Sequence, residues 1–239
     1  MKYFFKFILS LLIWLIYWIS AFLSISLLIL ISLVVPKKAY NPLVKLACVI
    51  MMYSAFIFPR HRGIKPEKVP YPVIYVANHV SFFDLFVSGT VLPGYPRGVE
   101  IKAHFSKPIY GWFITRFGEI PIDPSSKASI KKSFQEAETI LKEKIRSILF
   151  MPEGHRTRTG KLQNFRYGAF HLSRSSGIPV VPVVYKGLYQ RNNATSLLIK
   201  PGFFDVIILE PVYPEKFDSE EKMAEHVRQI MIKKLEERT

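Results

Sequence analysis

The longest apolar stretch of the chain lies at its N-terminus. Residues 7–35 contain no charged side chain, and this run exceeds the roughly 20 apolar residues that cross the hydrocarbon core of a bilayer. A cleaved signal peptide would have an apolar region of only about 7–15 residues, so we predict a membrane segment. Trp14, Tyr17 and Trp18 lie in the middle of the run, which leaves open a tilted span or a helix lying among the headgroups.

A second apolar run covers residues 43–58 and carries one charge, Lys45. It is short for a membrane span but suits a helix at the membrane interface. We therefore predict membrane-associated helices over residues 1–58 and an α/β domain over residues 59–239. Lysines flank the first run on both sides, at Lys2, Lys6, Lys37, Lys38 and Lys45. The positive-inside rule then gives a small preference for a domain on the cytoplasmic face of a membrane, the inner membrane in a bacterium.

Beyond a predicted linker at residues 59–72, short apolar runs alternate with segments whose apolar residues recur every three or four positions. The first pattern is typical of buried strands and the second of amphipathic helices. The predicted strands are residues 73–77, 99–101, 147–151, 180–185 and 205–209. One predicted helix begins at residue 81. Three more cover residues 129–143, 167–174 and 219–237, and Asp218 is the predicted N-cap of the last. This order predicts an α/β fold with a mixed central sheet flanked by helices.

Charge and composition narrow the possible partners. The chain has 33 Lys and Arg against 18 Asp and Glu, a net charge of +15, yet 49% of its residues are hydrophobic, which excludes a disordered basic tail. Such a chain suits an anionic lipid surface, and we expect no nucleic-acid partner because no base-reading motif occurs. The single cysteine, Cys48, has no disulfide partner and no metal-ligand spacing. No Gly-rich dinucleotide or phosphate-binding loop indicates a nucleotide.

Residues 78–84 (NHVSFFD) put a histidine and an aspartate directly after the strand predicted at residues 73–77. Ligand sites of open α/β sheets lie at the carboxyl ends of strands. If a helix begins near Ser81, His79 lies in the turn before it and Asp84 in its first turn, within reach of the imidazole. Such an aspartate fixes the tautomer and leaves the other ring nitrogen free as a general base. We interpret Ser81 as the helix N-cap, since no nucleophile-elbow pattern surrounds it.

Several ordered motifs follow. Residues 78–84 resemble the HxxxxD block of the glycerolipid acyltransferases, the PlsC-like 1-acyl-sn-glycerol-3-phosphate acyltransferase family. Residues 150–156 (FMPEGHR) are similar to the family's F-P-E-G-x-R block, and residues 178–183 (IPVVPV) resemble its V-P-V-x-P block. The resemblance covers about residues 70 to 215 and implies lipid acyl transfer catalysed by His79 and Asp84.

Lys102 and residues 118–123 (GEIPID) occupy the place of the family's intervening block. That block ends in Asp-Arg, whereas Pro124 replaces the arginine in this chain. The family uses basic residues from both central blocks against the phosphate of the acceptor, so the resemblance implies this role for Lys102. The missing arginine leaves the acceptor open between lysophosphatidic acid, another lysophospholipid and an amino-acid lipid.

The stretch from Pro152 onward is basic. Arg156, Arg158 and Lys161 suit a phosphate grip through charge-assisted hydrogen bonds, and Gly154 permits close approach of the backbone. Arg156 is our first choice as phosphate ligand, against the alternative that these are solvated surface charges. Glu153 either binds the free hydroxyl of the acceptor or holds Arg156 in place, and the sequence does not choose between them.

The resemblance implies that His79 takes the proton of the sn-2 hydroxyl of lysophosphatidic acid as that oxygen attacks the thioester of acyl-CoA or acyl-ACP. The expected partners are membrane lipids, the lysolipid and the acyl carrier, and the mechanism requires no metal and no other cofactor. Two alternatives belong to other classes. A thioesterase or lysophospholipase would use water in place of the lipid hydroxyl but lacks a convincing nucleophile, and a membrane adaptor would need no catalysis by His79.

Overall fold

The structure, a computed structural model, describes residues 2–35 and 40–237. Lys37 and Lys38, which enter the orientation prediction, lie outside the described residues. The helices are α1 (Lys2–Ser32), α2 (Tyr40–Ser54), α3 (Asp84–Val91), α4 (Tyr110–Phe117), α5 (Lys127–Lys142), α6 (Gly168–Ser176), α7 (Leu188–Arg191) and α8 (Glu220–Glu236). The strands are β1 (Ile57–Gly63), β2 (Ile74–Ala77), β3 (Arg97–Ile101), β4 (Ile120–Ile122), β5 (Ile148–Phe150), β6 (Val180–Lys186) and β7 (Gly202–Ile208). Short 3-10 helices lie at Pro66–Lys68, Lys102–Ser106 and Pro214–Lys216.

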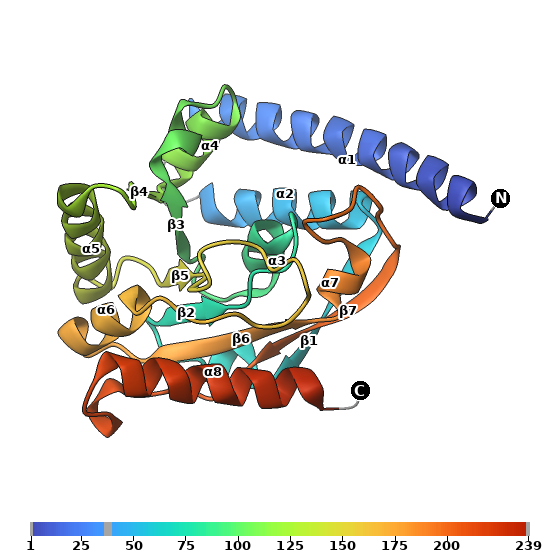
Figure 1. The fold of residues 1–239 in the computed structure, drawn as a ribbon. Coiled ribbons are helices and arrows are strands. Elements are labelled where there is room, and N and C mark those ends of the chain that lie inside the picture. Colours follow the sequence, from blue (N-terminus) through green and yellow to red (C-terminus); the bar gives the residue numbers. More distant parts are fainter. Residues whose placement is uncertain (1, 36–39, 238–239) are drawn as a thin grey trace.

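The strands form one mixed sheet in the order β1-β7-β6-β2-β5-β3-β4. Neighbouring strands run parallel except β6 and β7, which pair antiparallel. All four residues of β2 are buried, because helices lie on both faces of the sheet (Figure 1). The predicted mixed α/β sheet flanked by helices is confirmed.

Alternate side chains of the central strands enter two separate hydrophobic clusters. Tyr75 and Ala77 of β2 belong to an upper cluster together with residues of α1, α2 and α3. Ile74 and Val76 belong to a lower cluster with residues of α5, α6 and α8. Figure 1 shows the corresponding layers, with α1 and α2 above the sheet and α8 below it. The period of two along each strand therefore divides the core into these layers.

The linker predicted at residues 59–72 is wrong in its first part. β1 runs through Gly63 and pairs in parallel with β7 along its whole length. Its polar sequence concealed this pairing: Arg60 binds Asp205, 145 positions away, at 2.8 Å. The predicted division at residue 58 consequently falls inside β1, and α1 and α2 share the upper cluster with the sheet.

Several helices differ from the sequence prediction, and α8 and α4 show why. The N-cap of α8 is Ser219, whose hydroxyl accepts a hydrogen bond from the N–H of Lys222 at 3.3 Å. The predicted cap, Asp218, instead binds the Lys222 ammonium at 2.6 Å. α4 is not among the helices predicted from the sequence; it has only eight residues, too few to give a clear periodic pattern.

α1 combines an apolar composition with a mostly exposed surface. Among the described residues one helix, Tyr3–Ser32, is long and apolar enough to cross a membrane, and only 22% of its most apolar window is buried. Its buried side chains form one stripe at helical spacing: Ser10, Ile13, Tyr17, Ala21, Leu28 and Ser32. Large side chains such as Leu15, Phe22 and Leu30 remain exposed. This distribution suits contact with lipid on one side and with the domain on the other.

Met51 of α2 is fully buried in the upper cluster, whereas its neighbour Ile50 is 44% exposed. We expect Met51→Ala to lower the free energy of unfolding by about 2–5 kcal/mol because it leaves a cavity in the upper cluster. Ile50→Ala, the control, should change it far less. Denaturant unfolding of both variants in a mild detergent measures the difference, and equal stability of the two would show that α2 is not part of the folded core.

Candidate active site

The candidate site is built on the turn between β2 and α3. The Nδ1 atom of His79 lies 2.6 Å from Oδ2 of Asp84. The same oxygen accepts hydrogen bonds from the N–H groups of Val80 at 2.8 Å and Ser81 at 3.0 Å. Asp84 is the first residue of α3, where its negative charge also interacts favourably with the helix dipole. The turn thus brings together two residues that would point apart in a continuous helix.

α3 begins three residues later than predicted, and Ser81 is not its N-cap. Phe83 occupies that position without a side-chain cap. Ser81 is buried; its hydroxyl donates to Oδ1 of Asn192 at 3.1 Å and accepts from the N–H of Phe83 at 3.2 Å. A hydroxyl that is buried and bonded in this way is poorly placed for nucleophilic attack, which agrees with its interpretation as a structural group.

The arrangement of His79 and Asp84 defines what the imidazole can do. The side chain of Asp84 is 1% exposed and that of His79 is 26% exposed, so the carboxylate is shielded while the ring is accessible. An ionised carboxylate only accepts hydrogen bonds, so the Nδ1 atom carries the proton. The Nε2 atom of the neutral ring is then available to accept a proton from a bound hydroxyl.

The loop after β5 holds the backbone of His79 from both sides. The buried Glu153 accepts the N–H of His79 at 2.7 Å through Oε1 and the N–H of Gln163 at 2.9 Å through Oε2. The N–H of Thr157 donates to the carbonyl of His79 at 2.8 Å. Burial raises the pKa of Glu153, while the two backbone N–H groups oppose that rise. One carboxylate oxygen therefore holds the backbone of His79 and the other holds the backbone of Gln163. This positioning role differs from the two predicted for Glu153, whose contact with the acceptor hydroxyl stays a prediction.

The same loop carries three basic side chains. Arg156 and Arg158 flank Thr157 and are exposed, as is Lys161. In the described part of the chain, none of these three side chains forms a hydrogen bond or an ion pair. Their guanidinium and ammonium groups are thus available to an anionic ligand, and their role as phosphate ligands stays a prediction.

Gly154 has a left-handed backbone with φ of +76°, and a Cβ there would lie 2.8 Å from Nε of Arg166. The left-handed conformation therefore favours glycine, whereas the flexible Arg166 side chain could move away from a Cβ. The group that approaches the backbone here is the exposed Arg166 guanidinium. Arg166 was missed from the sequence because it lies beyond the matched motif, and only the return of the loop onto Pro152, whose carbonyl accepts the Arg166 N–H at 2.8 Å, brings it back.

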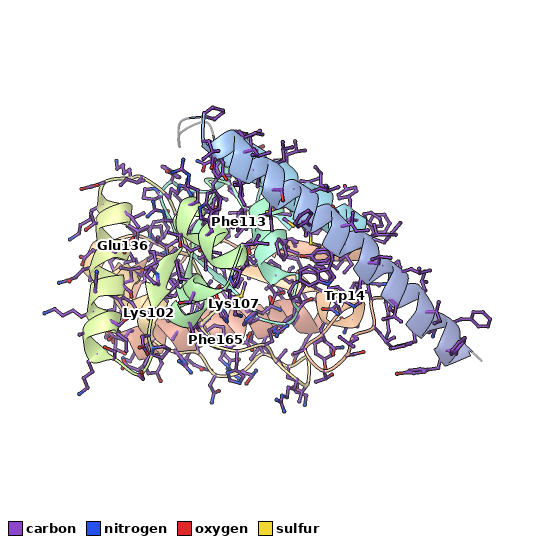
Figure 2. The ribbon with its side chains drawn as sticks, turned by 90° about the horizontal axis from the view of Figure 1, so that it is seen from above. Trp14, Lys102, Lys107, Phe113, Glu136 and Phe165 are labelled. Atoms are coloured by element: carbon purple, nitrogen blue, oxygen red, sulfur yellow. The ribbon has the colours of Figure 1, made fainter. Side chains whose placement is uncertain are left out.

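Lys102 follows β3 directly and is exposed. Since β2, β5 and β3 are parallel neighbours, their carboxyl ends present His79, the loop of Glu153 and Lys102 at one edge of the sheet. Lys102 lies two strands from β2, or roughly 10 Å. It lines a cavity of about 320 Å³ with Lys132 and Glu136 of α5, and Figure 2 shows it on the α5 side of the molecule. Contact with the same phosphate as Arg156 stays a prediction.

Pro124 lies in an exposed turn leading into α5. The preceding Asp123 accepts hydrogen bonds from the N–H of Ser125 at 3.0 Å and from its hydroxyl at 2.6 Å. These bonds lower the pKa of Asp123. The position that holds an arginine in the motif is therefore part of a tight polar turn in this protein.

Two further contacts link the site to the rest of the fold, and no local pattern in the sequence indicates them. The side-chain oxygen of Asn78 accepts the N–H of Tyr185 at 2.7 Å, which joins the end of β2 to β6. Asn192, which binds Ser81, begins a segment that reaches α1: the indole of Trp14 donates to the carbonyl of Leu197 at 2.7 Å. Trp14 also stacks on Phe83 at 5.6 Å between ring centroids. The apolar helix α1 thus contacts the turn that carries His79.

Comparison with known proteins identifies the family. The family model described as Acyltransferase matches residues 61–186, just over half of the chain. The chain belongs to this family. The matched residues include every site residue predicted from the sequence. The family resemblance noted in the sequence is confirmed.

Curated relatives are named 1-acyl-sn-glycerol-3-phosphate acyltransferase. The protein of Saccharomyces cerevisiae is 32% identical over 178 residues, which cover 70% of this chain and 56% of the relative. Chloroplastic BAT2 of Brassica napus is 32% identical over 151 residues, which cover 62% of this chain and 42% of the relative. The protein of Salmonella typhimurium is 28% identical over 166 residues, which cover 69% of this chain and 67% of the relative. The chain spans about half the length of the plant and yeast relatives it matches.

The fold of this family member also matches a solved structure. The crystal structure of the 1-acyl-sn-glycerophosphate (LPA) acyltransferase PlsC from Thermotoga maritima aligns with a TM-score of 0.79. The alignment covers 97% of this chain and 96% of that one at 22% identity. The likeness therefore extends to α1 and α2 as well as to the sheet.

Glu153→Gln tests whether the loop positions His79. The amide nitrogen would face one of the two backbone N–H donors, so we expect the free energy of unfolding to fall by about 1–3 kcal/mol. Turnover of the best acyl acceptor should fall while KM changes little, because His79 moves and the basic groups do not. The exposed Glu143→Gln serves as the control. An unchanged kcat for Glu153→Gln would contradict the positioning role.

Proposed function

We propose that this protein transfers a fatty acyl group from acyl-CoA or acyl-ACP to the sn-2 hydroxyl of lysophosphatidic acid, giving phosphatidic acid in phospholipid synthesis. The observation that carries the proposal is the accessible His79 ring held at 2.6 Å by the buried Asp84. Membership of the acyltransferase family supports it. The names of the plant, yeast and bacterial relatives support the choice of acceptor.

In the proposed reaction the Nε2 atom of His79 takes the proton of the acceptor hydroxyl while that oxygen attacks the thioester carbonyl. The new ester C–O bond forms, the C–S bond breaks, and the proton passes from His79 to the departing thiolate of the carrier. Backbone N–H groups or nearby basic side chains would stabilise the oxyanion. Because the thioester is already activated, the transfer needs no metal or redox cofactor, and it needs no acyl-enzyme on the buried Ser81.

The acceptor's phosphate is proposed to bind Arg156, with Lys102 as a second ligand. Arg156 lies one residue from Thr157, which touches His79, and its side chain is exposed. A guanidinium can bind two phosphate oxygens at once. A phosphate held there fixes the distance between the glycerol hydroxyls and the imidazole, which raises the effective concentration of the attacking oxygen.

We further infer that α1 lies in the membrane interface with the domain on the cytoplasmic face. The buried stripe of α1 packs lengthwise on the domain, from Ser10 to Ser32. A perpendicular span would carry α2 and the upper layer into the hydrocarbon, where their polar groups would lose water. A helix in the interface plane avoids this cost. The net charge of +15 favours the anionic cytoplasmic leaflet.

A second candidate has a different acceptor. Pro124 stands where the motif has an arginine, and this change removes a cation that could contribute to headgroup recognition. The same site could then acylate another lysophospholipid or an amino-acid lipid. A panel of lysolipids with the purified protein and labelled acyl-CoA or acyl-ACP decides between these acceptors.

His79→Ala tests the chemistry. We expect loss of acyl transfer by about 10²–10⁴-fold, with vesicle association retained because α1 is unchanged. Thin-layer analysis of labelled products measures transfer and free acid together. Normal transfer by the variant would refute the role of His79. Release of free fatty acid without dependence on any lysolipid would instead indicate a thioesterase.

Arg156→Ala separates binding from catalysis. The loss of a charge-assisted bond should raise KM for the phosphate-bearing acceptor by about tenfold or more and change kcat less. Lys200→Ala removes the same charge from an exposed site outside the loop and is the control. An equal rise in KM for both variants would show that the net charge of the protein, and not a direct contact with Arg156, causes the change.

A further inference from the structure

We propose that residues 106–112, which connect the end of the 3-10 helix after β3 to the first turn of α4, insert into the lipid bilayer as a membrane contact separate from α1. We call this segment the 106–112 tip. Four successive residues of it, from Ser106 to Ile109, are exposed. Ile109 is 49% exposed and Trp112 is 40% exposed. An isoleucine and a tryptophan exposed so close together form an apolar surface for which the described part of the fold offers no cover.

The backbone of the tip holds Ile109 outward in an unfavourable conformation. Ile109 has φ of +63° and ψ of −57°, a region that β-branched residues rarely occupy. The turn is fixed by close packing, since a Cβ on Gly111 would lie only 2.1 Å from the carbonyl oxygen of Phe105. The N–H of Gly111 also donates to the carbonyl of Lys107 at 2.7 Å. The fold therefore maintains strain at a residue that stays about half exposed, which points to a contact outside the chain.

The tip lies on the same side of the molecule as α1. Phe113 and Ile114 anchor α4 in the upper cluster, and Arg116 donates to the carbonyl of Ser32 at the end of α1. Figure 1 shows α1 and α4 together in the top layer, and Figure 2 shows α4 beside α1 from above. The exposed apolar side chains of α1 and those of the tip can therefore meet one bilayer at the same time.

The charges around the tip favour a bilayer over a second copy of the chain. Lys107 is exposed within the tip, and Lys102 is exposed just before it. Apolar side chains that enter lipid beside lysines that bind headgroups are typical of interfacial membrane contacts, and tryptophan is favoured at that depth. Two copies facing each other through this surface would instead bring like charges together.

The position of the tip also matters for substrate access, a consequence that rests on the proposed function. The tip follows Lys102 at the sheet edge that carries His79. Inserted into the leaflet, it would hold that edge against the lipid surface, so that a lysolipid could move sideways into the site without leaving the membrane.

Site-directed labelling tests the insertion. The single native cysteine, Cys48, is 5% exposed, so Ile109→Cys can be labelled with a polarity-sensitive fluorophore in the full chain. Tyr213→Cys is the control; this residue is 37% exposed and follows Val212 of the lower cluster. On vesicles of phosphatidylcholine and phosphatidylglycerol, the label at 109 should shift to the blue and be quenched by lipids with a nitroxide on the acyl chain. The label at 213 should do neither.

Unshifted emission at 109 on vesicles that bind the protein would overturn the proposal. So would a blue shift that rises with protein concentration in the absence of vesicles, because that result indicates a second copy. Unlabelled wild-type protein carried through the same reaction checks that Cys48 stays unmodified.

The vesicle affinity of Ile109→Asp provides a second test, with Tyr213→Asp as the control variant. We expect vesicle affinity to fall by roughly tenfold for the first variant, because a carboxylate replaces an aliphatic group in lipid. Transfer to vesicle-embedded lysophosphatidic acid should fall with it, whereas transfer to a short-chain soluble acceptor should not. Affinity equal to that of Tyr213→Asp would contradict insertion. Absence of transfer to either acceptor in the wild type would refute the proposed function and leave the labelling result standing.

Discussion

A single buried oxygen, Oδ2 of Asp84, accepts hydrogen bonds from the imidazole of His79 and from the N–H groups of Val80 and Ser81. These three bonds shape the turn between β2 and α3 and fix the ring at the same time. The same carboxylate begins α3, so the position of the helix and the tautomer of the histidine are set by one group. Loss of this acceptor would leave two backbone donors buried without partners as well as an unoriented base.

The rest of the site supports this turn from three directions. Glu153 and Thr157 hold the backbone of His79 at its N–H and its carbonyl. Asn192 binds Ser81 from the segment after α7, and Trp14 of α1 stacks on Phe83. Catalytic groups act best when their rotamers are locked by a surrounding shell. Here that shell includes the apolar helix α1, so the orientation of the imidazole and the packing of α1 on the domain share contacts.

Exposed groups complete the arrangement. The side chains that point outward at the carboxyl edge of the sheet are basic, at Arg156, Arg158 and Lys102, while those of α1 and of the 106–112 tip are apolar. This division matches the chemistry of a lysolipid, whose phosphate and acyl chain require different surroundings. A protein that presents both kinds of surface could bind the proposed acceptor while the acyl chain of that lipid stays in the leaflet.

The sequence by itself determined the α/β class, the buried strands and the pairing of His79 with Asp84, because hydrophobic periodicity and a short turn are local properties. Family motifs added the basic loop. The sequence could not determine β1, whose polar residues join the sheet only through β7, or the role of Glu153, whose partner lies 74 positions earlier. The placement of Arg166 and the contact of Asn192 with Ser81 likewise depend on residues far apart in the sequence. Tertiary structure decided these features because hydrogen bonds and close packing depend on distance in space.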